Sequence, residues 1–169
     1  PSEQVFLENV IDFNQRNVNQ VMTPRTRMAA LSVDADRQAT LALICEERHS
    51  RYPVYQEDRD HILGILHVKD VARHLLTPKG EWDLRSMVRP AVFVPESISL
   101  DEMLAQFRAQ HFQVAIVVDE YGGTAGIVTL EDLAEEIVGE IQDEFDEEQA
   151  PFVAVDDHLL RVRGDLLLD

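Results

Sequence analysis

Cysteine, positive charge and long apolar runs are all scarce in this chain of 169 residues. The single cysteine, Cys45, excludes an internal disulfide and a zinc site built from several cysteines. Its position on the apolar side of a helical pattern predicts a buried and unreactive thiol. No apolar run approaches the roughly 18 residues that a membrane-spanning helix requires, so we expect no such helix in this stretch.

A deficit of lysine and arginine makes the chain strongly acidic. It has 15 basic and 32 acidic residues, and its formal net charge is −17. Nucleic acids and anionic lipid surfaces both bind through lysine and arginine, so this charge argues against either partner. The hydrophobic fraction of 45% and the charged fraction of 28% are typical of a globular protein. We therefore expect a globular protein with no nucleic-acid partner.

Catalytic motifs are also missing. The six histidines form no His-Glu-x-x-His motif, and there is no Gly-x-Ser-x-Gly nucleophile elbow. The glycine-rich run Tyr121–Gly126 lacks the Gly-Lys-Ser/Thr ending of a phosphate loop and joins two expected strands, which favours a hairpin turn. The residues therefore predict neither an enzyme nor a metal site formed by the protein alone.

An internal repeat is the main feature that the sequence does contain. Residues 21–73 and 87–135 follow the same pattern, and both end in Gly-Ile-(Leu/Val)-x-x-x-Asp, at Gly64–Asp70 and Gly126–Asp132. These two ends lie 62 residues apart without a gap. A repeat of this kind fixes the architecture before any other feature is interpreted. We expect a pseudo-twofold pair, with ligand sites in the clefts between the copies.

Hydrophobic spacing predicts the same order, β-α-β-β-α, in each copy, and so an α/β (α+β) fold. The first copy is expected to form a strand over 28–33, a helix over 37–48, strands over 52–56 and 61–67, and a helix over 69–76. The second is expected to form a strand over 92–94, a helix over 99–110, strands over 113–119 and 124–129, and a helix over 130–141. A helix over 3–19 precedes them, and strands over 151–155 and 159–162 follow.

Four segments follow from this pattern. We assign residues 1–20 to a leading helix, 21–80 to the first repeat, 81–148 to the second repeat and 149–169 to the start of a further small domain. The chain begins without methionine and ends in mid-pattern, so we expect it to be a piece of a longer protein.

The sequence Thr129-Leu130-Glu131-Asp132 has two interpretations. Thr129 followed three residues later by Asp132 forms nearly a capping box, which would stabilise the last helix by about 1 kcal/mol. The same atoms could instead aim the N–H groups of the helix at a phosphate, with Asp132 accepting hydrogen bonds from a ribose. Spacing alone leaves both open.

The sequence Ser50-Arg51-Tyr52-Pro53 also has two interpretations. It could simply begin a strand, with Tyr52 packed inside and Arg51 in solvent. It could also present Ser50 and Arg51 to phosphates, with Tyr52 and Pro53 near a flat base, because arginine binds phosphate through two parallel hydrogen bonds. Nearby, the first copy has four extra residues, Arg25–Met28, which could line a pocket or form a surface insertion.

The repeated unit resembles a tandem pair of CBS domains, a Bateman module. The runs Val21–Arg25, Ser50–Tyr55, Gly64–Leu66 and Val118–Asp132 are more specifically similar to those of the CorC/HlyC magnesium and cobalt efflux proteins, which are in turn similar to the CNNM transporters. The resemblance covers roughly residues 2–145. The segment from Pro151 is similar to the start of the transporter-associated domain of that group.

This resemblance implies a regulatory adenine-nucleotide sensor, and not an enzyme. It implies ATP or AMP as the ligand, Mg²⁺ carried by the nucleotide, association into a homodimer, and a cytoplasmic position beside the membrane transport domain of the parent protein or of a partner. The alternative from the residues alone is a structural dimerisation module with empty clefts, in which Thr129 and Asp132 only cap a helix.

The resemblance also implies two sets of site residues. In one cleft, Thr129 and Asp132 would hold phosphate and ribose, Glu131 would lie near the phosphates or their metal, and the remaining residues would come from the first repeat: Thr23, Arg27, Met28, Ser50, Arg51, Tyr52 and Pro53. A second, weaker cleft would use Asp70, Phe112, Gln113 and Val114. His67 stands there in place of threonine, so we expect poorer nucleotide binding.

Overall fold

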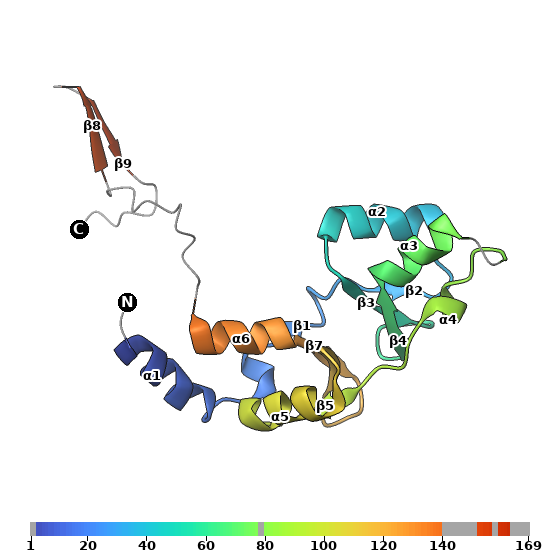
Figure 1. Cartoon of the computed structure of the whole chain (residues 1–169), viewed down its shortest axis with the longest axis horizontal. Helices are drawn as coiled ribbons and strands as arrows, with labels where there is room; N and C mark the ends of the chain where they lie inside the picture. Colours follow the sequence, from blue (N-terminus) through green and yellow to red (C-terminus); the bar gives the residue numbers. More distant parts are fainter. Residues whose placement is uncertain (1–2, 78–79, 140–151, 157–158, 163–169) are drawn as a thin grey trace. The chain divides into compact units, whose positions relative to one another are not determined.

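The computed structural model describes residues 3–77, 80–139, 152–156 and 159–162. The chain divides into two units, Pro1–Gly139 and Glu140–Asp169. In the second unit, β8 (Phe152–Asp156) and β9 (Leu159–Val162) form an antiparallel hairpin. The two strands expected near 151–155 and 159–162 are therefore confirmed. All other described elements belong to the first unit, which contains both repeats (Figure 1).

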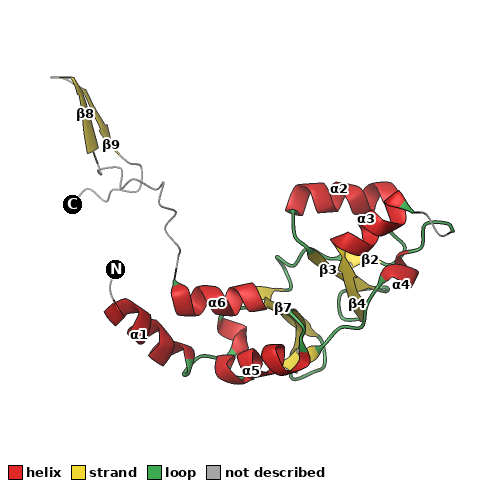
Figure 2. Ribbon diagram, in the orientation of Figure 1, coloured by secondary structure: helices red, strands yellow, loops and turns green. Residues whose placement is uncertain are grey.

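The first repeat forms a three-stranded sheet in the order β2-β3-β4, from β2 (Leu31–Ser32), β3 (Arg51–Tyr55) and β4 (Ile62–His67). The helices α2 (Arg37–Glu47) and α3 (Val68–Leu76) lie on one side of it (Figure 2). Tyr52, Val54 and Leu66 alternate toward these helices and form a buried cluster with them. A short helix, α4 (Leu84–Met87), follows, and the sequence pattern gave no indication of it.

The second repeat has the same plan. Its sheet contains β5 (Phe93–Pro95), β6 (Val114–Val118) and β7 (Thr124–Thr129), and the helices α5 (Leu100–Gln110) and α6 (Leu130–Val138) cover one face. The leading segment forms α1 (Glu3–Phe13) and a 3-10 turn, η1 (Val18–Gln20), so the helix expected over 3–19 ends earlier. Phe13 and Val18 are buried in the core of this second repeat.

The two sheets meet through their other faces. Ile65 from β4 and Val114 and Ile116 from β6 form a separate buried cluster, in which each side chain is no more than 7% exposed. The layers therefore run helices, sheet, sheet, helices, with both outer layers amphipathic, as the periodicity of each copy requires. The α/β class and the doubled β-α-β-β-α order are confirmed.

Each sheet also receives backbone from the segment that opens the other copy. The strand β1 (Thr23–Pro24) belongs to the opening segment of the first repeat but pairs antiparallel with β7 of the second sheet. Arg89, in the opening segment of the second repeat, forms the matching bridge to Ile65 of the first sheet. Gly126 and Gly64 lie at these crossings, where an added Cβ would stand 2.2 Å from the carbonyl oxygen of Thr23 or of Arg89. Only glycine allows so close an approach of two backbones.

Other expectations differ in detail from the structure. The strand expected over 28–33 is only Leu31–Ser32. The prediction that Cys45 is buried is wrong, because its thiol is exposed. The buried side of α2 passes through Thr40 and the partly buried Leu41 and Ile44, so Cys45 falls at its margin. Positions 140–148 of the second repeat and the end of the helix expected to reach 141 lie outside the described residues.

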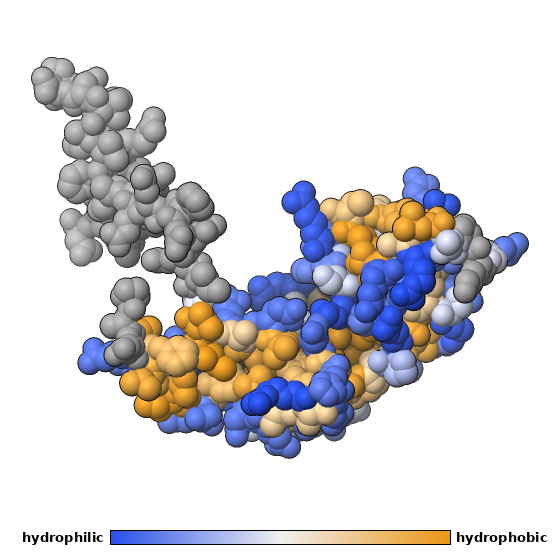
Figure 3. Space-filling model, in the orientation of Figure 1, coloured by the Kyte–Doolittle hydropathy of each residue, from blue (hydrophilic) through white to orange (hydrophobic). Residues whose placement is uncertain are grey.

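Apolar side chains are exposed over α1, where Figure 3 shows them gathered on one face. Val5, Phe6, Leu7 and Ile11 are each at least half exposed. No helix in the described part of the chain is long and apolar enough to cross a bilayer.

The division of the chain into four segments, 1–20, 21–80, 81–148 and 149–169, stays a prediction.

Candidate functional site

A cleft of about 210 Å³ lies at the C-terminal end of β7, between the two repeats; we call it the first cleft. Eight of the ten residues predicted for a nucleotide site line it: Thr23, Arg27, Met28, Ser50, Arg51, Thr129, Glu131 and Asp132. They come from separate parts of the sequence, namely the opening segment of the first repeat, the start of β3, and the junction of β7 with α6. The repeat symmetry, which predicted a site between the copies, explains why they meet.

The N-terminus of α6 points its first turn into this cleft. The Thr129 hydroxyl accepts a hydrogen bond from the Asp132 amide at 3.1 Å, and Asp132 Oδ2 accepts one from the Thr129 amide at 2.7 Å. The capping box expected from the spacing is therefore formed. It uses one oxygen of the Asp132 carboxylate, and no described residue bonds to the other, Oδ1. Capping and ligand binding are thus compatible at this position.

Arg51 spans the space between the two repeats. Its Nη1 atom lies 3.8 Å from Glu131 Oε1, across the first cleft, and its Nη2 atom donates to Gln113 Oε1. Gln113 is the position 62 residues later, so the contact joins equivalent sites of the two copies. Together with Arg27, Arg51 brings positive charge into a cleft that also contains Glu131 and Asp132. The first cleft therefore carries both signs of charge.

Two predicted residues are not in the lining of this cleft. Tyr52 is fully buried in the core of the first repeat, where its hydroxyl accepts a hydrogen bond from the His49 amide at 2.9 Å. Successive side chains of a strand point to opposite faces, so Arg51 and Tyr52 cannot both face the cleft. Pro53 is buried further along β3, opposite Ile65. Their assignment to the base side of a nucleotide is not supported by this structure.

Four residues that line the first cleft were not predicted for it from the sequence: Ala29, His49, Val114 and Ile127. Val114 had been assigned only to the second cleft, and it lines both. Alternation along β6 and β7 could have placed Val114 and Ile127 on the face between the sheets. Nothing in the sequence pattern separates Ala29 or His49 from neighbouring surface residues.

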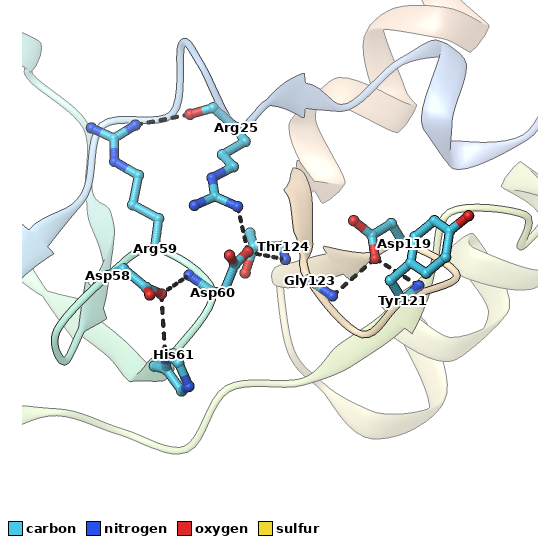
Figure 4. Close-up of polar contacts among 9 residues, drawn as sticks. All are labelled: Arg25, Asp58, Arg59, Asp60, His61, Asp119, Tyr121, Gly123 and Thr124. Atoms are coloured by element: carbon cyan, nitrogen blue, oxygen red, sulfur yellow. Dashed lines mark hydrogen bonds and ion pairs between the residues drawn. The ribbon is translucent and has the colours of Figure 1, made fainter.

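The four extra residues of the first copy, Arg25–Met28, begin at a residue that contacts the turn between β3 and β4 (Figure 4). Arg25 forms an ion pair with Asp60, and the Arg59 side chain donates to the Arg25 carbonyl at 2.8 Å. Asp60 also accepts the Thr124 amide of the other repeat at 2.9 Å. Arg27 and Met28, at the end of this segment, line the cleft. The insertion therefore contributes to the cleft wall.

This junction predicts an acid-sensitive contribution to stability. The hydrogen bond from Arg25, followed by that from the Thr124 amide, lowers the pKa of Asp60. A carboxylate with a lowered pKa in the folded state stabilises the fold above its unfolded pKa and loses this contribution as the pH falls toward the folded value. We expect Asp60→Asn to melt below the wild type at pH 7, and the difference to shrink below about pH 4.

Thermal melting of both proteins from pH 7 to pH 3 measures this effect. Asp34→Asn is the matched control, because Asp34 is exposed and its carboxylate bonds to no described residue. A difference between the wild type and Asp60→Asn that stays constant down to pH 3 would contradict the assignment.

A second cleft, of about 360 Å³, lies beside the first between the repeats. Phe112, Gln113 and Val114 line it as expected, but Asp70 does not. The Asp70 carboxylate instead accepts two hydrogen bonds from Arg89, at 2.7 and 2.9 Å, and these bonds are the main cause of its lowered pKa. Asp70 is the counterpart of Asp132, so the carboxylate that would hold a ribose is already hydrogen-bonded to an arginine. The placement of Asp70 in this cleft is corrected accordingly.

Metal-binding clusters are absent from the described part of the chain, where no three His, Cys, Asp or Glu side chains converge. Glu131 is 68% exposed and is 3.8 Å from Arg51. The lining of the first cleft contains two carboxylates, those of Glu131 and Asp132, which are fewer oxygen ligands than a resident metal ion needs.

Comparison with known proteins agrees with this architecture. The CBS domain family matches residues 18–77 and 82–139. The magnesium and cobalt efflux protein CorC of Vibrio cholerae is 43% identical over 144 residues, which are 85% of this chain and 50% of that protein. The chain thus spans about half the length of the curated relatives that it matches.

Two solved structures contain adenine nucleotides. The CBS domain of a bacterial CNNM/CorC family Mg²⁺ transporter in complex with ATP is 43% identical, with a TM-score of 0.73 over 83% of this chain and 100% of that one. A CBS-domain pair with bound AMP from Klebsiella pneumoniae is 32% identical, with a TM-score of 0.64 over 73% of this chain and 98% of that one.

Proposed function

The chain belongs to the CBS domain family, as a tandem pair of the kind found in CorC and CNNM transport proteins, and we propose that it is a regulatory module that binds an adenine nucleotide in the first cleft. The observation that carries this proposal is the convergence of Arg51, Thr129 and Asp132 on one cleft. These residues supply a phosphate-binding cation, a helix N-terminus and a free carboxylate oxygen, which are complementary to the two ends of a nucleotide.

Each part of the ligand has a matching group. The Oδ1 atom of Asp132 accepts the ribose hydroxyls while Oδ2 maintains the cap. The phosphates lie toward Thr129, the first turn of α6 and Arg51, since a helix N-terminus attracts anions and arginine binds phosphate oxygens in pairs. The apolar members of the lining, Met28, Ala29, Val114 and Ile127, contact the adenine.

Magnesium enters this proposal with the nucleotide. A bare triphosphate would lie close to Glu131 and Asp132, and repulsion from these carboxylates opposes binding. Glu131 would help to hold Mg²⁺ brought by the phosphates, and the charge of the ion would offset this repulsion.

Calorimetric titration of the chain with ATP, AMP and adenosine, each with and without Mg²⁺, tests the proposal. Saturable binding of an adenine nucleotide is expected, and ATP binding should strengthen when Mg²⁺ is added. Equal ATP affinity with and without Mg²⁺ would contradict the role of Glu131. Absence of binding for all three ligands in a folded protein would contradict the proposed function.

Arg51 provides a second prediction. Arg51→Gln should weaken ATP binding about tenfold or more, because charge-assisted hydrogen bonds to a phosphate are lost. Adenosine, which lacks phosphate, should lose little affinity. Arg37→Gln is the control, since Arg37 is exposed in the first turn of α2 and lines neither cleft. Equal losses for ATP and adenosine would place Arg51 away from the phosphates.

The alternative function is a structural dimerisation module with empty clefts. The complete capping box of Thr129 and Asp132 favours it, because this geometry needs no ligand to explain it. It predicts no change in melting temperature when nucleotide is added. On either proposal, the module associates as a homodimer on the cytoplasmic side of the transport domain of its parent protein or of a partner. The relatives are transport proteins, so a non-enzymatic role holds at the level of the family.

A further inference from the structure

The second cleft has a charge opposite to that of the chain as a whole. Its lining contains three permanent cations, Arg51, Lys69 and Arg89, together with His67 and His111. No aspartate or glutamate is among the eleven residues that line it. In a protein with a formal net charge of −17, a cavity of 360 Å³ lined only by cationic and neutral side chains needs a specific explanation.

The repeat shows how the two clefts diverged. Lys69 stands 62 residues before Glu131, and His67 stands 62 residues before Thr129. The second cleft therefore has a lysine where the first has a glutamate, and a histidine where the first has a threonine. The carboxylate that remains, Asp70, is outside the lining and is held by Arg89. The second cleft thus lies at the position equivalent to the proposed phosphate site, on which this inference rests, and its lining has no free carboxylate that could hold a ribose.

Arg51 and Arg89 have acidic partners, Glu131 and Asp70, but donors in this cleft remain unused among the described residues. The Lys69 ammonium forms no ion pair with any described residue, and the two Arg89 bonds to Asp70 come from Nε and Nη2, leaving Nη1. Burial lowers the pKa of His67, and the charges of Arg89, Arg51 and Lys69 lower it further, while Asp70 opposes them. The cations therefore repel one another, and an anion placed among them would relieve this repulsion.

We propose that the second cleft binds a condensed phosphate, such as pyrophosphate, through Lys69, Arg89 and His67, without requiring a ribose or a base. A condensed phosphate carries several negative charges, so it offsets the three cations of this lining, Arg51, Lys69 and Arg89, better than a monoanion does. The same chemistry is offered by a free condensed phosphate and by the phosphate tail of a nucleotide. The site is separate from the first cleft, although both share Arg51.

Titration of the 169-residue chain with inorganic pyrophosphate at low salt tests this proposal. We expect saturable binding that weakens as salt rises, since the contacts are ionic. Lys69→Gln should reduce the affinity about tenfold, and the control Arg37→Gln should leave it unchanged. Absence of pyrophosphate binding, or equal affinity of Lys69→Gln and Arg37→Gln, would overturn the proposal.

A variant of the first cleft separates this proposal from the proposed nucleotide function. Asp132→Asn removes a carboxylate of the first cleft and should leave pyrophosphate affinity unchanged. If the variant lowered pyrophosphate affinity by the same factor as adenosine affinity, the phosphate would bind in the first cleft and the proposal would be overturned. ADP is then titrated into the same variant. If ADP binds as tightly as pyrophosphate, the phosphate tail of a nucleotide is a ligand of the second cleft. If pyrophosphate binds and ADP does not, the ligand is a free condensed phosphate. Both outcomes support the second cleft as the site.

Discussion

Replacing Asp132 with asparagine is expected to weaken binding of ATP, AMP and adenosine alike, by roughly 10- to 100-fold. Asp132 Oδ2 already accepts the Thr129 amide, and Oδ1 is the atom proposed for the ribose. Asparagine has a single acceptor oxygen, so it can keep either the cap or the ribose contact. A hydrogen bond to a charged acceptor contributes about 1.5–3 kcal/mol, which corresponds to this range of affinity.

Calorimetric titration of the variant with the three ligands measures the loss. Its fold should persist, because a missing cap costs only about 1 kcal/mol. Asp70→Asn is a matched control at the equivalent position of the other repeat, where Arg89 occupies the carboxylate. It should lower the melting temperature and leave nucleotide affinity nearly unchanged. Wild-type affinity in Asp132→Asn would favour the structural alternative.

Replacing Gly126 with valine is expected to have the largest effect on the fold. A Cβ at this position would stand 2.2 Å from the Thr23 carbonyl oxygen and 3.2 Å from Met22 Sδ. The Thr23 carbonyl is backbone within the β1–β7 pairing, so it cannot turn away as a flexible side chain would. We expect a loss of roughly 3 kcal/mol or more in the free energy of unfolding, because overpacking forces the backbones apart.

Urea unfolding measures this loss, and nucleotide titration shows its consequence. If β1 separates from β7, Thr23 and the segment that follows it leave the first cleft, and binding falls with stability. Gly122→Asn is the control: Gly122 has a φ of +81°, a region that asparagine tolerates, and no atom lies within 4 Å of an added Cβ. A loss below about 1 kcal/mol in Gly126→Val would contradict the exchange of backbone between the repeats.

The shared arginine gives the two clefts a physical connection. Arg51 directs one nitrogen toward Glu131 and another toward Gln113, and it lines both clefts. An anion in either cleft competes for the same guanidinium. If both proposals hold, Arg51→Gln weakens phosphate binding in both clefts, whereas Lys69→Gln and Asp132→Asn each affect one.

Much of this protein was determined by its sequence alone. The 62-residue repeat predicted two equivalent β-α-β-β-α units, and both are present because each copy has the amphipathic periods of its own helices and strands. The same repeat predicted a site between the copies, and eight of ten proposed residues do line one cleft. Local patterns were sufficient because a strand end and the following helix start are set by neighbouring residues, as the cap of Thr129 and Asp132 shows.

Only the tertiary structure decided which side chains meet across the repeats. Tyr52 lies in the core because alternation along β3 turns it away from the cleft that Arg51 lines. Asp70 and Asp132 have equivalent sequence positions. Arg89, which lies 19 residues beyond Asp70, nevertheless donates hydrogen bonds to Asp70 and not to Asp132. Pairing of β1 with β7 joins residues about 100 positions apart. Such contacts depend on the packing of distant segments against one another, which neither periodicity nor local spacing encodes.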